Sequence, residues 1–285
     1  MASFILTLTA EDRVGLVAAV TGFLADHDGF ILDSQQYADL ETGRFFMRVE
    51  FKSAGAKFPA SIDALKSAFA SVAEAHQLDW QLDAGDAPPS IVIAVSKASH
   101  CLNDLLHRWH TGTLPVNIAA VVSNHESCQS LTEWHDVPFH YLPVSDDNRA
   151  EQEAGIRAIM EESGAETLVL ARYMQILSAD MVDRLAGHCI NIHHSFLPGF
   201  KGARPYHRAF ERGVKLIGAT AHFVTADLDE GPIIEQAVER VDHRASVEDM
   251  IRIGRDIEAQ VLARSVKWIG ERRLLLNGMR TVVFR

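Results

Sequence analysis

The chain has 285 residues, which is long enough for one large or two modest domains. Apolar residues make up 47% of it and charged residues 23%, a balance typical of soluble globular proteins. A net charge of −11 argues against a nucleic-acid partner, because nucleic-acid surfaces need clustered Lys and Arg side chains.

Neither a membrane segment nor a disulfide framework is expected. No apolar run approaches the ~20 residues that span a bilayer, and the first residues lack the basic leader of a signal peptide. The three cysteines, Cys101, Cys128 and Cys189, form no CxxC pair. The sequence therefore predicts a cytoplasmic protein with free thiols and no membrane partner.

The N-terminal part is predicted to fold as strand, helix, strand, strand, helix, strand. Asp12 is expected to cap the first helix, which ends near Gly29. A hairpin is expected around the turn at residues 41–43, and apolar residues at helical spacing follow it. The predicted elements are strands over residues 4–9, 30–40, 44–52 and 78–83, and helices over residues 12–28 and 62–72.

The first turn of this unit carries Asp12, Arg13, Gly15 and Leu16. With the order of elements, this Asp-Arg-x-Gly-Leu motif resembles an ACT domain, a ferredoxin-like βαββαβ fold. The resemblance implies a small amino-acid effector at these four residues and a homo-oligomer formed by paired copies. The alternative is that Gly15 only lets the first helix pack close to its sheet. We place this regulatory domain at residues 1–84.

Residues 85–285 are predicted to form an α/β catalytic domain. A short Pro- and Gly-containing linker ends at Ser90, and apolar strands then alternate with helices. Apolar strands separated by helices predict a Rossmann-like, mostly parallel sheet buried on both faces. Ligands of such sheets bind beyond the carboxyl ends of the strands. The predicted strands cover residues 91–95, 118–122, 139–142, 167–171, 189–193 and 217–225.

Three polar residues are predicted to meet at that sheet edge. Asn191 and His193 end a strand and should point to the same face, about 7 Å apart along it. Asp229 follows the next strand in an acidic loop, where Asp227 and Glu230 are its competitors. An amide, an imidazole and a carboxylate together suit attack on an acyl carbon with oxyanion stabilisation.

A catalytic metal is not expected, although four histidines lie in this region. Zinc catalysis needs three protein ligands with a defined geometry. The alternation of a strand places His193 and His194 on opposite faces, and the chain has no HExxH pattern. The other two histidines are His188 and His222.

From residue 89 to about residue 262 the chain resembles the folate-dependent formyltransferase domain. Asn191-Ile-His193 and Asp229-x-Gly231 match the motifs that carry the asparagine, histidine and aspartate of that family. The resemblance implies that Asn191 and His193 hold the formyl oxygen and that Asp229 holds the attacking water. Its implied substrate contacts are Met174, Gln175, Ile176, Leu177, Ala226, Asp227 and Leu228. The loop at residues 196–205 is expected either to wall the folate tail, with Lys201 or Arg204 near an anionic group, or to be a plain connector.

The whole arrangement more closely resembles the formyltetrahydrofolate deformylase family, which joins an ACT domain to this catalytic domain. His194 agrees with that branch, because the transferases commonly have proline there. The stretch at residues 96–101 also lacks the glycines that would cradle the phosphate of an acceptor. The resemblance implies hydrolysis of 10-formyltetrahydrofolate, the substrate, without a separate cofactor, and a role in one-carbon balance and formate supply for purine synthesis.

Two other functions remain open at this point. One is formyl transfer to an amine acceptor, and the other is a non-catalytic amino-acid sensor in which the folate domain only binds. Residues 263–285 carry basic and apolar stretches that suit either a terminal strand or a tail packed on a neighbour.

Overall fold

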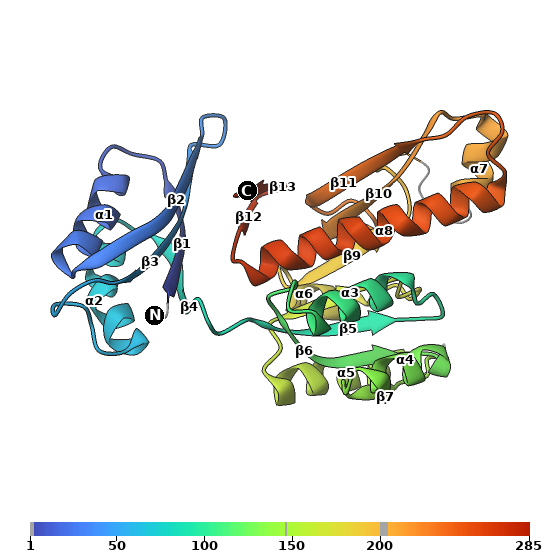
Figure 1. The fold of residues 1–285 in the computed structure, drawn as a ribbon, viewed down its shortest axis with the longest axis horizontal. Coiled ribbons are helices and arrows are strands. Elements are labelled where there is room, and N and C mark those ends of the chain that lie inside the picture. Colours follow the sequence, from blue (N-terminus) through green and yellow to red (C-terminus); the bar gives the residue numbers. More distant parts are fainter. Residues whose placement is uncertain (1–2, 146, 200–204) are drawn as a thin grey trace. The chain divides into compact units, whose positions relative to one another are not determined.

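The computed structural model describes residues 3–145, 147–199 and 205–285 (Figure 1). These residues form two compact units. The first contains residues 3–88, 272–277 and 282–285, and the second contains the rest. The sequence analysis placed the boundary after residue 84 and gave the whole C-terminus to the catalytic domain. The structure differs because the terminal segment supplies apolar side chains to the first unit.

The first unit is an antiparallel sheet with two helices, as predicted for a ferredoxin-like fold. The strand order is β2-β3-β1-β4. Helices α1 and α2 pack on the sheet through an apolar core that includes Leu8, Phe23 and Phe69. The elements are β1 (Ser3–Glu11), α1 (Leu16–Asp26), β2 (Gly29–Asp39), β3 (Arg44–Ser53), α2 (Ile62–Ala75) and β4 (Asp79–Ala84).

The start of α1 differs from the prediction that Asp12 caps it. The N-cap is Gly15, which has a φ of 102° and provides no side-chain cap. Glycine suits this position because other residues rarely adopt the left-handed region. Asp12 instead lies in the preceding turn, where its backbone N–H donates to the carbonyl of Gly43.

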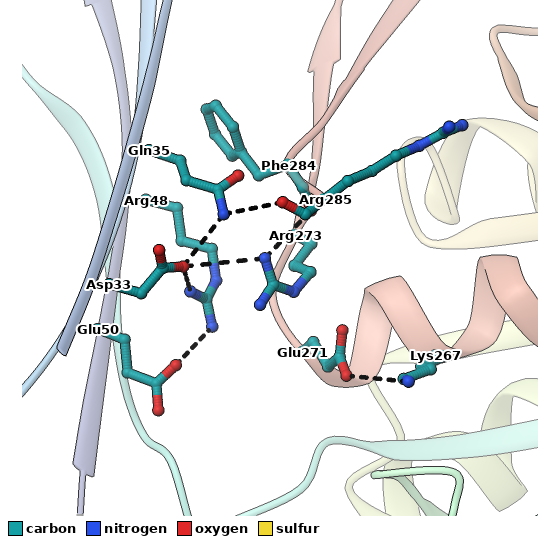
Figure 2. Close-up of polar contacts among 9 residues, drawn as sticks. All are labelled: Asp33, Gln35, Arg48, Glu50, Lys267, Glu271, Arg273, Phe284 and Arg285. Atoms are coloured by element: carbon teal, nitrogen blue, oxygen red, sulfur yellow. Dashed lines mark hydrogen bonds and ion pairs between the residues drawn. The ribbon is translucent and has the colours of Figure 1, made fainter.

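The C-terminal segment closes the first unit. Val282 and Phe284 pack against Phe46 in a small buried cluster. Figure 2 shows the Asp33 carboxylate paired with two guanidinium groups, at distances of 3.2 Å to Arg48 and 3.9 Å to Arg273. The C-terminus forms a strand pair, β12 (Leu274–Asn277) and β13 (Arg280–Val283), in agreement with the first of the two options predicted for it.

The second unit is a seven-stranded sheet with the order β11-β10-β9-β8-β5-β6-β7. The strands from β5 to β9 are parallel to one another, which confirms the mostly parallel sheet. Its strands are β5 (Ser90–Val95), β6 (Asn117–Ser123), β7 (Phe139–Tyr141), β8 (Thr167–Leu170), β9 (Cys189–His193), β10 (Leu216–Phe223) and β11 (Ile233–Arg240). Its helices are α3 (His100–His110), the short 3-10 helix at Glu126–Cys128, α4 (Gln129–Trp134), α5 (Arg149–Ser163), α6 (Ala179–Arg184), α7 (Pro205–Arg212) and α8 (Val247–Gly270).

Helices cover both faces of this sheet. Helix α5 contributes Ile156 and Met160 to a core that contains the β5 residues Val92 and Ala94. Helix α8 packs against α3, β10 and β11, and a capping box at Ser246 begins it. Among the described residues, no helix is both long enough and apolar enough to cross a membrane.

The last two strands do not follow the parallel pattern. β10 is antiparallel to β9 and β11 is antiparallel to β10. The loop after β10 therefore begins beside the amino end of β9, where the N–H of Val224 donates to the carbonyl of Cys189. The expectation that Asp229 lies at the carboxyl edge of a parallel strand is wrong; its loop turns back along β9 instead.

Candidate active site

The last strand of the parallel set presents the amide and the imidazole. Asn191 and His193 lie two residues apart on β9, so both point to one face, and Ile190 and Ile192 are buried on the other. His193 is only 4% exposed. A rigid strand therefore holds both polar groups at the wall of the site.

The carboxylate of Asp229 lies against this pair. Its Oδ2 atom is 3.3 Å from Nδ1 of His193, and this hydrogen bond lowers the pKa of the Asp229 carboxyl below its ordinary value. Nε2 of His193 is buried and has no hydrogen-bond partner among the described residues. The imidazole is thus fixed on one side by Asp229, and its other nitrogen is left for a ligand.

His222 belongs to the same constellation, although the sequence analysis considered it only as a metal ligand. It lies opposite Asn191 in the β9–β10 pair. Its Nδ1 lies 2.8 Å from the carbonyl of Phe223 and donates to it, so its Nε2 is an acceptor, 3.3 Å from Nδ2 of Asn191. Burial lowers the pKa of His222, which favours the neutral ring. The only signal in the sequence was its place on a strand expected beside β9.

The backbone of the acidic loop is closely fitted. Asp229 has a φ of 58°, an uncommon conformation for a residue with a side chain. Two residues later, a Cβ atom on Gly231 would lie 1.8 Å from the carbonyl oxygen of Phe223. Glycine at this position therefore lets the loop pass close to the end of β10 and brings Asp229 to His193.

A cavity of about 680 Å³ opens over these side chains. Six of the seven expected substrate contacts line it, in two groups: Met174, Gln175, Ile176 and Leu177 after β8, and Ala226 and Leu228 after β10. Asp227 is not among the lining residues; its carbonyl accepts bonds from Thr225 and Glu230 within the loop. Met174, Ile176 and Leu228 are largely exposed apolar side chains, which suits an apolar ring as ligand.

The turn after β8 is held by Ser96, from the stretch that follows β5. Its hydroxyl lies 2.7 Å from Asn124 Oδ1 and accepts from the N–H of Met174 at 3.0 Å. The N–H of Ser96 in turn donates to the carbonyl of Arg172. The ends of β5 and β8 are thereby joined under the apolar wall of the cavity.

The residues expected to bind an effector lie in the first unit. Gly15 begins α1, Leu16 is buried, and Asp12 is exposed in the turn. Arg13 donates to the carbonyl of His76 and to the side chain of Gln77.

Of the loop at residues 196–205, Lys201 and Arg204 lie outside the described residues.

Comparisons with known proteins agree with both units. Residues 2–82 match the family model described as an ACT domain, and residues 90–266 match the one described as a formyl transferase. The formyltetrahydrofolate deformylase of Bacillus subtilis is 50% identical over 280 residues, covering 98% of this chain and 93% of that protein. The chain belongs to the formyltetrahydrofolate deformylase family.

Solved structures place the chain in the same family. The crystal structure of a formyltetrahydrofolate deformylase from Pseudomonas syringae matches this chain with a TM-score of 0.96 and 46% sequence identity. The match covers 100% of this chain and 95% of that one. A glycinamide ribonucleotide transformylase from Symbiobacterium toebii has a TM-score of 0.65 and 28% identity, over 70% of this chain and 96% of that one. As a formyltetrahydrofolate deformylase family member, the chain is a hydrolase whose catalytic domain shares its fold with transferases.

Proposed function

We propose that the chain hydrolyses 10-formyltetrahydrofolate to formate and tetrahydrofolate. The observation that carries this proposal is the contact of Asp229 Oδ2 with His193 Nδ1, which leaves Nε2 of a ring that lines the cavity with Asn191 without a partner among the described residues. This arrangement offers two donors to one oxygen and a carboxylate to a water molecule. The family relatives that share both units bear the corresponding name.

In the proposed reaction, water attacks the formyl carbon and gives its proton to the free oxygen of Asp229. The N–H of the Asn191 amide and Nε2–H of protonated His193 donate to the oxyanion of the tetrahedral intermediate. Collapse of the intermediate breaks the bond between carbon and N10, and N10 takes the proton that Asp229 received from water. Tetrahydrofolate and formic acid leave, and the acid loses its proton to the solvent as formate, so Asp229 and His193 return to their starting states.

The substrate contacts are part of the same proposal. The pterin ring would lie along residues 174–177, where backbone groups read its polar edge and the apolar side chains flank its faces. Ala226 and Leu228 would close the opposite wall. No cofactor takes part in the proposed steps, because formyl transfer to water needs neither oxidation nor reduction.

Three wider assignments accompany this reaction. We propose that the ACT unit takes a small amino acid as effector, with glycine and methionine as first candidates, and pairs with a second copy. We place the enzyme in the cytoplasm, where its three buried free cysteines would stay reduced. Release of formate and tetrahydrofolate there would balance one-carbon units and supply formate for purine synthesis.

The test is to incubate the native chain with 10-formyltetrahydrofolate in ¹⁸O-labelled water, without any acceptor amine. Equal amounts of tetrahydrofolate and of formate carrying one ¹⁸O atom are expected. Binding of the folate without formate release would overturn the proposal.

A further inference from the structure

A second set of titratable side chains lines the same cavity without a part in the proposed steps. It consists of His100 on α3, Arg172 after β8, Tyr206 on α7 and Glu258 on α8. Glu258 is 1% exposed, although it lies in the middle of a helix where charged residues usually face water. We call these four residues the Glu258 network.

The Glu258 carboxylate is engaged by all three of its neighbours. Oε2 lies 2.9 Å from His100 Nε2 and 3.4 Å from Arg172 Nε, and Oε1 accepts from the Tyr206 hydroxyl at 2.7 Å. Burial raises the pKa of Glu258, but the hydrogen bond from His100 and the charge of Arg172 outweigh it, so the net pKa is lowered. A buried carboxylate paired in this way forms a fixed wall, because losing one partner would leave an uncompensated charge.

Two backbone features serve this network. Arg172 has a φ of 65°, a conformation that favours glycine and is rare for a residue with a long side chain. Gly254, one turn before Glu258, makes room for Tyr206: a Cβ atom there would lie 2.0 Å from the Tyr206 hydroxyl. Backbone strain and a fitted glycine both point to a functional wall.

The network reaches the catalytic residues through His194. The prediction that His193 and His194 point to opposite faces is wrong, because β9 ends at His193 and both rings line the cavity. The ring of His194 lies 5.0 Å from that of His193 and 6.3 Å from that of Tyr206. A contiguous row of side chains therefore runs from Asp229 and His193 to Glu258. The Glu258 network therefore continues the wall of the cavity that the catalytic residues form.

The cluster also contains three potential metal ligands, since atoms of His100, Cys101 and Glu258 lie within 4.8 Å of one another. Its charges disfavour a metal ion. The Arg172 guanidinium already pairs with the Glu258 oxygen that a metal would need. Burial and the nearby Glu258 raise the pKa of the Cys101 thiol well above its usual value, whereas metal binding requires a thiolate.

We propose that the Glu258 network determines the formyl acceptor: as a fixed, internally paired wall of the cavity, it admits water and excludes an amine. This rests on the proposed hydrolysis. An amine would have to come within about 3–3.5 Å of the formyl carbon to attack it. An approaching ammonium group would meet the Arg172 cation on this wall, and the Glu258 carboxylate is already paired with Arg172 and His100.

The proposal predicts that opening the wall allows formyl transfer to an amine. In that reaction the amine nitrogen attacks the formyl carbon and the bond between that carbon and N10 breaks. The amine nitrogen loses one proton, and N10 gains one. The variant Arg172→Gly removes the guanidinium group, so Glu258 can bind an ammonium group in its place. Glycine also adopts the left-handed conformation of residue 172 without strain. The variant Gly254→Ala displaces Tyr206 without changing any polar group.

The experiment supplies 10-formyltetrahydrofolate together with glycinamide, a small primary amine, and measures the ratio of N-formylglycinamide to formate by mass spectrometry. The native chain should give formate alone. Both variants should raise the ratio roughly tenfold or more, the discrimination that a small change of pocket shape provides. Gly155→Ala is the matched control, because a Cβ atom there makes only ordinary contacts of 3.5 Å with Leu142.

Three outcomes would overturn the proposal. In the first, both variants give the same ratio of N-formylglycinamide to formate as the native chain. Another is a native chain that already formylates glycinamide in preference to water. The third is loss of formate release in both variants, because the network would then serve hydrolysis itself. Failure of the proposed function is distinct from these, since the native chain would then release no formate even without glycinamide.

Discussion

Nδ2 of Asn191 lies 3.3 Å from Nε2 of His222, a ring whose Nδ1–H is already committed to the carbonyl of Phe223. His222 can therefore only accept at Nε2, which fixes the Asn191 amide with its nitrogen toward the ring. One amide hydrogen is used in this bond, and the other remains for a ligand in the cavity. His222 acts as a positioning residue for the oxyanion donor.

We expect His222→Leu to lower kcat for formate release about 10- to 100-fold with little change of KM, because a misoriented donor weakens transition-state binding. The variant His222→Gln, whose side-chain oxygen can accept from Asn191, should recover part of the loss. Steady-state kinetics of both variants provide the measurement. A His222→Leu enzyme with native kcat would show that Asn191 needs no such support.

The close passage of Gly231 beside β10 predicts a second effect. Gly231→Ala places a Cβ atom 1.8 Å from the carbonyl of Phe223, so the loop that carries Asp229 must shift. We expect a loss of about 1–3 kcal/mol in unfolding free energy and a lower kcat. Thermal unfolding and formate release measure both, with Gly155→Ala as the control. Native activity in Gly231→Ala would show that the close passage of this loop beside Phe223 is not needed to position Asp229.

Stability should depend on pH through His194. Burial lowers the pKa of its ring from 6.5 to about 4, so the unfolded chain binds this proton at a higher pH than the folded one. The stabilisation is complete above pH 6.5 and is lost as the pH falls toward 4, by about 3 kcal/mol in all. Denaturant unfolding across this range should show a shallower slope for His194→Gln. The variant His188→Gln, at an exposed position, controls for the loss of one imidazole ring. An unchanged pH dependence of the unfolding free energy in His194→Gln would show that His194 does not cause it.

The C-terminal segment should stabilise the first unit. Phe284 is 6% exposed and packs with Phe46, so Phe284→Ala is expected to cost about 3 kcal/mol. Hydrogen exchange of β3 amides reports this unit alone, which a global unfolding curve of two domains does not. Leu276→Ala, at a position 39% exposed, is the control. Equal protection in both variants would show that the segment is dispensable for the unit.

Local sequence patterns were sufficient for most of the fold. Alternating and helical periodicities located the elements of the first unit and the strands from β5 to β10 within a few residues, because burial of one face leaves a clear period. Strand β11 and the long helix α8 were not among the predicted elements. The direction of β10 was not predictable, since an apolar strand such as Ile217–Phe223 is compatible with either direction. The packing of Phe284 depends on a partner more than two hundred residues away, which no local pattern encodes.

In the active site, too, local patterns predicted some residues, whereas the roles of others depend on distant partners. Asn191 and His193 were found because two residues on one strand share a face. The pairing of His222 with Asn191 depends on strand register, and the burial of Glu258 depends on three partners from other elements. A glutamate in a helix normally predicts a solvated face, so its role became visible only with the partners in place.

The central claim is that the carboxylate of Asp229 is the base of the hydrolysis. The most direct test compares kcat for formate release, at saturating 10-formyltetrahydrofolate, in Asp229→Asn and in Asp227→Asn. The first change should lower kcat roughly 10²–10⁴-fold while folate binding persists. The second, on the same loop but outside the cavity lining, should leave kcat within about twofold of the native value. Equal effects of the two changes, or a fully active Asp229→Asn enzyme, would contradict the account.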